Sequence, residues 1–126
     1  MNDVAAVGPP PVLVVDDDLH VRQVVQWALE DAGFTVVTAA DGEAALVQAA
    51  ICRPRVVVLD FGLPNADGVT VAAQLRSTCG SGLSIMLITA DGRAAEKAAR
   101  VGAYAYLHKP FEDRALVATV LRGLGG

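Results

Sequence analysis

Three aspartates, one threonine and one lysine each stand at or just beyond the end of a short apolar run: Asp16, Asp17, Asp60, Thr89 and Lys109. Carboxylates brought together repel, at about 3 kcal/mol for an ionised pair roughly 5 Å apart with an effective dielectric near 20. Such a cluster therefore needs a bound cation or raised pKa values. Oxygen-only ligands favour Mg²⁺, and an added hydroxyl and ammonium indicate a site that accepts a phosphoryl group.

These residues come together only if the apolar runs are parallel strands of one sheet. Short β-branched runs alternate with longer segments of helical periodicity. We predict strands at 12–15, 34–38, 56–59, 83–88 and 104–107. We predict helices at 19–32, from Asp41-Gly42 to Arg53-Pro54, and at 69–78, 94–101 and 111–124.

Strands separated by helices require right-handed crossovers and a parallel sheet that helices cover on both faces. The runs at 12–15 and 56–59 are apolar at every position, which is typical of strands buried on both sides. The predicted class is a doubly wound α/β fold. Because parallel strands end at one edge, and open α/β sheets bind ligands there, the five polar residues are expected to converge.

Length and composition limit the function. For the 126 residues we predict one domain (12–124), after a flexible leader (1–11) and before a two-residue tail (125–126). A net charge of −4 and a pI near 4.9 disfavour direct nucleic-acid binding. The chain shows no signal peptide and no apolar run of about 18 residues, which predicts a cytoplasmic protein with no membrane contact. Cys52 and Cys79 are expected to be reduced thiols, with a bridge as the alternative.

Four stretches resemble the receiver domains of two-component response regulators, over essentially all of residues 12–124. Each is a weak motif alone, but all four in order at compatible spacing are highly specific. They are the acidic opening Val14–Asp18, the phosphoacceptor loop Val58–Gly68, the hydroxyl segment Leu87–Ala90 and the lysine-proline segment Gly102–Phe111.

The resemblance implies the flavodoxin-like strand order 2-1-3-4-5 and a role for each site residue. Asp60 is the expected phosphoacceptor, and the expected ligands of Mg²⁺ are Asp60, Asp17, Asp16 through water and the main-chain carbonyl of Gly62. Asp18 is expected to cap the following helix. The residues expected to hold the phosphoryl oxygens are Thr89, Lys109 and the amide of Ala90, with a cis peptide at Lys109-Pro110.

The resemblance implies a domain that acts as a switch and not as an ordinary enzyme. Such a domain promotes its own phosphorylation and dephosphorylation. Thr89 is expected to move toward the phosphate and to vacate space that Tyr106 fills; the alternative for Tyr106 is an ordinary core aromatic. Gly62 and Asp91 are expected to flank the phosphate and to influence how fast water removes it. The helix at 94–101 is expected to be weakly held, since it offers mainly alanines (Ala94, Ala95, Ala98 and Ala99) to the sheet.

The expected partners are a histidine kinase or a histidine phosphotransfer protein, with Trp27 as a candidate contact on the first helix. The face formed by the fourth helix, fifth strand and fifth helix is the expected contact for a second copy or an effector. Phe61 is expected to pack at the pocket rim, and His20 and His108 to be ordinary surface residues.

Two other classes share the sheet. A flavodoxin-like electron carrier needs a hydroxyl- and glycine-rich loop after the first strand, where this chain has Asp16, Asp17 and Asp18. A receiver fold that acts as an unphosphorylated interaction module needs no complete site. The sequence does not specify the kinase, the output, the phosphate lifetime, the oligomeric state, or whether the domain stands alone.

Overall fold

The computed structural model describes residues 10–64 and 66–125. Most of the predicted leader and Gly126 of the predicted tail therefore lie outside the described residues, as does Asn65 in the loop after the third strand. Within the described residues, no helix is both long and apolar enough to cross a membrane.

The centre of the molecule is one sheet of five parallel strands in the order β2-β1-β3-β4-β5, as predicted. The two strands at its middle, β1 and β3, are buried along their whole length, because helices cover both of their faces. The strands are β1 (Val12–Val15), β2 (Val36–Ala39), β3 (Val56–Asp60), β4 (Ser84–Thr89) and β5 (Ala105–His108).

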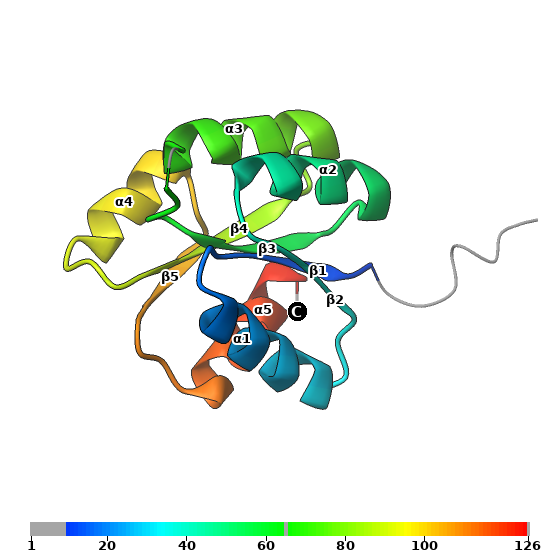
Figure 1. Ribbon diagram of the computed structural model, residues 1–126, viewed down its shortest axis with the longest axis vertical. Helices are drawn as coiled ribbons and strands as arrows, with labels where there is room; N and C mark the ends of the chain where they lie inside the picture. The colour runs from blue at the N-terminus through cyan, green and yellow to red at the C-terminus, as the bar shows by residue number, and fades with distance from the viewer. Residues whose placement is uncertain (1–9, 65, 126) are drawn as a thin grey trace, which may run out of the picture.

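Five helices form two layers around the sheet (Figure 1). Helices α2, α3 and α4 pack on one face, over a core that includes Leu59, Leu75 and Leu87, and α1 and α5 pack on the other, over a core that includes Leu29 and Leu116. The helices are α1 (Leu19–Asp31), α2 (Gly42–Cys52), α3 (Gly68–Cys79), α4 (Ala94–Val101) and α5 (Asp113–Gly123). The doubly wound, flavodoxin-like class is confirmed.

Aspartate side chains fix where three helices begin. Asp18 accepts hydrogen bonds from the amides of His20 and Val21, Asp41 from that of Ala44, and Asp67 from that of Val69. Each bond satisfies an amide that has no partner inside its helix. The prediction that Asp18 caps α1 is confirmed, which leaves the other two aspartates of the triplet free for the site.

Two predicted elements begin two residues too early, and several other predicted boundaries differ from the structure by one residue. Strand β2 begins at Val36 rather than at residue 34, because the Phe34 amide donates to the carbonyl of Leu29 and so belongs to the turn that ends α1. Gly33 in that turn has a φ of 99°, which an L side chain rarely adopts. Helix α5 begins at Asp113 rather than at residue 111, since Glu112 has extended backbone geometry.

The expected inner face of α4 is half wrong. Ala94 and Ala98 are buried together with Val101, but Ala95 and Ala99 are exposed. Because alanine repeats at so many positions, the sequence alone could not separate the inner face from the outer one. The apolar contact of this helix is thus smaller than predicted.

The two cysteines lie on neighbouring helices and carry free thiols. Cys52 is the last residue of α2 and Cys79 the last of α3, and both are half-buried. The expectation of reduced thiols is confirmed, although neither is fully buried. Burial raises the pKa of both thiols, which lowers the fraction present as reactive thiolate.

Candidate functional site

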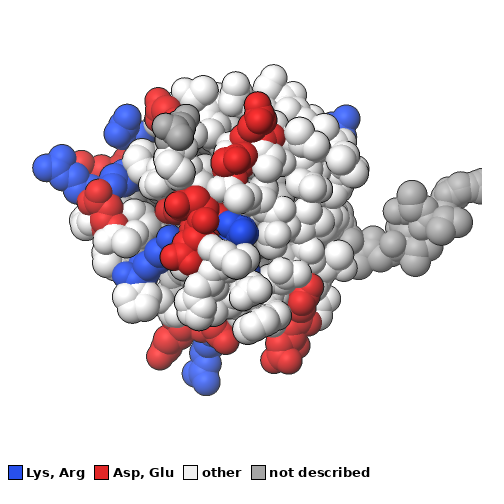
Figure 2. Space-filling model, viewed as in Figure 1, with Lys and Arg blue, Asp and Glu red and all other residues white. Residues whose placement is uncertain are grey.

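Three carboxylates meet where β1 and β3 end, the point at which the strand order of the sheet reverses. Asp16 and Asp17 follow β1, and Asp60 is the last residue of β3. One carboxylate oxygen from each residue lies within 4.8 Å of the others. Figure 2 shows acidic atoms gathered over the middle of this face, with Lys or Arg atoms beside them. Oxygen ligands at this spacing suit a hard divalent cation.

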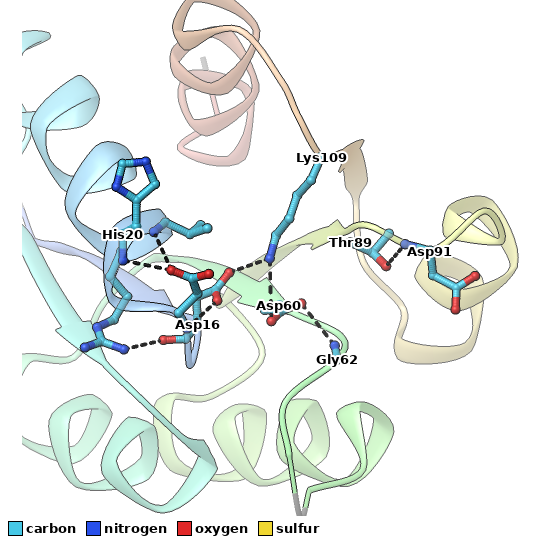
Figure 3. Close-up of polar contacts among 10 residues, drawn as sticks. Asp16, His20, Asp60, Gly62, Thr89, Asp91 and Lys109 are labelled. Atoms are coloured by element: carbon cyan, nitrogen blue, oxygen red, sulfur yellow. Dashed lines mark hydrogen bonds and ion pairs between the residues drawn. The ribbon is translucent and has the colours of Figure 1, made fainter.

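Lys109 supplies the positive charge of the site (Figure 3). Its Nζ lies 2.8 Å from Oδ2 of Asp16 and 3.7 Å from Oδ2 of Asp60. The peptide bond from Lys109 to Pro110 is cis. Burial lowers the pKa of the ammonium, but the bond to Asp16 and the charge of Asp60 outweigh burial, so the pKa is raised overall. Lys109 therefore stays charged well beyond neutral pH.

The carboxylate of Asp16 is fully buried and already engaged. One oxygen accepts the amide of Asp18 at 2.9 Å and the other accepts Lys109. The main-chain carbonyl of Asp16 accepts Nη1 of Arg22 at 2.8 Å. Asp17, in contrast, is exposed. A cation that enters the site can therefore reach Asp17 and Asp60 directly, whereas Asp16 has no oxygen free of an existing bond.

The surroundings of Asp60 disfavour the charged form of its carboxyl. Only 6 % of the residue is exposed, and burial raises the pKa of its carboxyl, with the charges of Asp16 and Asp17 acting in the same direction. The Gly62 amide, which donates to Oδ1 at 3.0 Å, and the charge of Lys109 lower the pKa in part. A divalent cation beside Asp60 would favour the charged, nucleophilic carboxylate.

Thr89 stands opposite Asp60, at the end of β4 (Figure 3). It is 3 % exposed, and its Oγ1 accepts the amide of Asp91 at 3.0 Å. Ala90 is exposed and lines a hollow together with Lys109. The structure thus brings Thr89, Lys109 and the three carboxylates to one edge, as the sequence predicts. Gly62 presents its amide to Asp60, and its predicted role as a carbonyl ligand stays a prediction.

The four residues that were predicted to lie outside the acidic cluster are all exposed. Tyr106 is 45 % exposed, on the outer side of β5, so the alternative of a core aromatic is wrong. Trp27 is 63 % exposed beside a hollow between α1 and α5. His20 and His108 are exposed, as expected. Tyr106 is the one partner of the predicted switch that lies away from the site.

Sequence reasoning missed two cations that border the site. Arg22 in α1 binds the Asp16 carbonyl, and Lys97 in α4 forms an ion pair with Asp91. Arg22 had a usable signal, because it lies one helical turn after the capping Asp18 and so on the side of α1 that faces the strand end. Lys97 had none, because it lies six positions after Asp91 and the sequence does not show which side of α4 turns back toward the loop after β4.

These features define a doubly wound α/β domain with an acidic, lysine-bearing site at the switch point of its sheet. The family model of the response regulator receiver domain matches residues 12–121. The chain belongs to this family and is a receiver domain of the kind found in two-component systems.

Individual relatives support the membership of this chain in the family. A response regulator named MprA from Mycolicibacterium vanbaalenii is 44 % identical over 112 residues, which cover 87 % of this chain and 48 % of that protein. A probable transcriptional regulator, ycf27, from Cyanophora paradoxa is 39 % identical over 111 residues, 86 % of this chain and 46 % of that one. The chain spans about half the length of the curated relatives it matches.

Solved structures show the same fold. The chemotaxis protein CheY4 of Vibrio cholerae has a TM-score of 0.82 at 34 % identity, over 91 % of this chain and 98 % of that chain. The receiver domain of NtrX from Brucella abortus has a TM-score of 0.83 at 32 % identity, over 90 % and 98 % of the two chains. The similar fold over nearly the whole of these domains, together with the family match, confirms the predicted family and fold.

Proposed function

We propose that Asp60 accepts a phosphoryl group from a phosphohistidine on a partner kinase or phosphotransfer protein. One carboxylate oxygen of Asp60 forms a bond to phosphorus, and the phosphorus–nitrogen bond of the donor breaks, with its electron pair left on the imidazole. The observation that carries the proposal is the meeting of three carboxylates around Asp60, with Lys109 reaching into them. The proposed functional unit is residues 12–124, with 1–11 as a leader and 125–126 as a tail.

The residues around Asp60 fit a bound Mg²⁺. We assign Asp17 and Asp60 as direct ligands with the carbonyl of Gly62, and Asp16 as a ligand through water, because both its oxygens already accept hydrogen bonds. When bound, the cation neutralises the negative charge of the incoming group. Asp18 has no part in the site, since its carboxylate caps α1.

Three groups of the chain are proposed to hold the phosphoryl oxygens. Lys109 provides an ammonium, Thr89 a hydroxyl and Ala90 a main-chain amide, which together match the charge and acceptor oxygens of the group. To donate to phosphate, Thr89 must turn toward Asp60, away from the Asp91 amide that it now accepts. Tyr106, now exposed, is proposed to move inward into the space that Thr89 leaves.

The change is proposed to reach partners through the face of α4, β5 and α5. A hollow on this face is lined by Ala95, Ala99, Tyr106 and Arg122, so an inward movement of Tyr106 alters its shape. A second copy of the chain or an effector is the proposed partner there. Water then removes the phosphoryl group, and the switch resets. The domain itself influences the rate of this step, through residues around the phosphate that include Gly62 and Asp91.

Acetyl phosphate, which donates without a partner protein, tests the proposal. With Mg²⁺ we expect the intact mass to rise by one phosphoryl group, and with EDTA we expect no rise. Asp17→Asn should slow uptake at least about tenfold, because it removes the proposed direct ligand and more than about 1.4 kcal/mol of stabilisation. Asp31→Asn, which removes an exposed acid at the far end of α1, should take up phosphate at the wild-type rate. Uptake that is equal in EDTA would exclude the metal-dependent reaction.

Trp27 is proposed to contact the phosphohistidine donor. Its exposed ring borders an apolar hollow formed with Val24 and Leu121, and buried tryptophans often dominate binding at protein interfaces. We expect Trp27→Ala to slow transfer from a phosphorylated histidine donor about tenfold and to leave uptake from acetyl phosphate unchanged. The control is Ile51→Ala, which removes an equally exposed apolar residue from α2 on the other face. An equal loss with both donors would refute the contact.

A further inference from the structure

One side chain of α4 reaches two residues that border the site. The Nζ of Lys97 lies 2.5 Å from Oδ2 of Asp91 and 5.0 Å from the centre of the Phe61 ring. The Lys97 side chain is only 15 % exposed, although α4 is a surface helix. A cation over an aromatic ring is attracted by its negative face, more strongly when little water surrounds it. Lys97 therefore has two attractive partners at once.

Each partner of Lys97 is joined to a site residue. Phe61 follows Asp60 directly in the chain, and its ring rests against Gly68, where an added Cβ would lie 2.9 Å from Cδ1 of Phe61. The ring thus has no room to move toward α3. Asp91 donates its amide to the hydroxyl of Thr89. Lys97 consequently contacts the two loops that follow Asp60 and Thr89.

Among the described residues, the other ion pair of the first half of α4 is the long, exposed one between Glu96 and Arg93. The first residue of the helix follows Arg93, whose side chain makes no capping hydrogen bond, and the buried residues of the helix are mainly alanines. The far end is fixed differently, because the guanidinium of Arg76 donates to the carbonyls of Val101 and Gly102 at 2.7 and 2.8 Å. Helix α4 is therefore anchored firmly at its end and, at its start, chiefly through Lys97.

We propose that Lys97 is the positioning residue that couples α4 to the phosphorylation site, an inference that rests on the proposed phosphorylation of Asp60. In the unphosphorylated protein Lys97 holds the first half of α4 against Asp91 and Phe61. A phosphoryl group that draws the Thr89 hydroxyl toward Asp60 takes that hydroxyl from the Asp91 amide. The loop after β4 then moves and carries Asp91, the partner of Lys97, with it, so the start of α4 is released.

Amide hydrogen exchange of α4 in the unphosphorylated protein tests the inference first. Lys97→Met keeps the length of the side chain but removes the charge, and we expect exchange of the hydrogen-bonded amides of α4, which begin with that of Lys97, to rise about five- to tenfold. Lys97→Arg should stay near wild type. The matched control is Arg93→Gln, which removes an exposed cation of the same segment and its long ion pair with Glu96; it should change exchange less than about twofold.

Asp91→Asn breaks the same ion pair from the side of the loop, without changing any residue of α4. We expect it to raise exchange in α4 as well, and the double variant with Lys97→Met should exchange no more than about twofold faster than Lys97→Met alone, because both changes remove one interaction. Wild-type exchange in Lys97→Met, or an equal rise in Arg93→Gln, would overturn the inference.

Acetyl phosphate then separates this inference from the proposed function. In phosphorylated wild type the hydrogen-bonded amides of α4 should exchange nearly as fast as in unphosphorylated Lys97→Met, and phosphorylation should add less than about twofold in that variant. If both proteins are phosphorylated and their exchange rises by the same factor, Lys97 is not the coupling residue. If neither takes up phosphate, the proposed function fails, and with it the coupling, whatever the exchange of the unphosphorylated proteins.

Discussion

We expect Lys109→Met to lower the free energy of unfolding by about 2–3 kcal/mol at pH 7 without Mg²⁺. The substitution removes the ammonium 2.8 Å from Asp16, whose carboxylate is fully buried, and leaves that charge without a cation. A buried pair broken on one side commonly costs about 3–5 kcal/mol. The lower figure applies because a fifth of the Lys109 side chain is exposed and water can partly replace it.

The loss should depend on pH and on metal. Removing Lys109 takes away a charge that lowers the pKa of Asp60, so a pKa already raised by burial rises further. A carboxyl with a raised pKa in the folded state destabilises the fold once it ionises, so the loss grows as pH rises through that pKa. The loss should shrink as pH falls below the raised pKa of Asp60, because the protonated carboxyl no longer needs a nearby cation. Mg²⁺ should restore part of the stability at pH 7 by neutralising the carboxylates.

Urea unfolding between pH 4 and pH 8, with EDTA or with Mg²⁺, measures these effects. Arg114→Met removes an exposed cation from α5 and should change the free energy of unfolding by less than about 0.5 kcal/mol at every pH. If Lys109→Met were as stable as Arg114→Met at pH 7 in EDTA, the ion pair with Asp16 would not hold the site together.

The sequence alone was sufficient to predict the edge of the sheet on which the site lies. Asp16, Asp60 and Thr89 each end an apolar run, and once the runs are parallel strands their ends must meet. The capping role of Asp18 was also readable, because a carboxylate before a helix bonds its first amides. Local rules of this kind depend only on neighbouring residues.

Features that depend on how the elements pack could not be predicted in the same way. Lys109 and Asp16 are 93 positions apart, and no pattern shows that Lys109 bonds Asp16 rather than Asp60. The pairing of Lys97 with Asp91 depends on the angle at which α4 meets the loop after β4. Likewise, a single tyrosine in a short strand gives no sign of which side it faces, and Tyr106 faces outward. Such features need the packed structure.

Asp60→Asn is expected to abolish phosphoryl uptake, because the amide oxygen that replaces the carboxylate is a poor nucleophile and a weak ligand for Mg²⁺. No other carboxylate is as well placed among the described residues: Asp16 is fully bonded and Asp17 is exposed at the entrance. Asp113→Asn, an exposed acid in α5, serves as the control and should be modified as wild type is.

The most direct measurement locates the phosphoryl group in the wild-type chain. After reaction with acetyl phosphate and Mg²⁺, borohydride converts aspartyl phosphate to homoserine, which peptide sequencing identifies in the tryptic fragment 56–76. Homoserine at position 60, absent from Asp60→Asn, is the predicted result. Homoserine at another aspartate, or an undiminished mass increase in Asp60→Asn, would contradict the proposal that Asp60 receives the phosphoryl group.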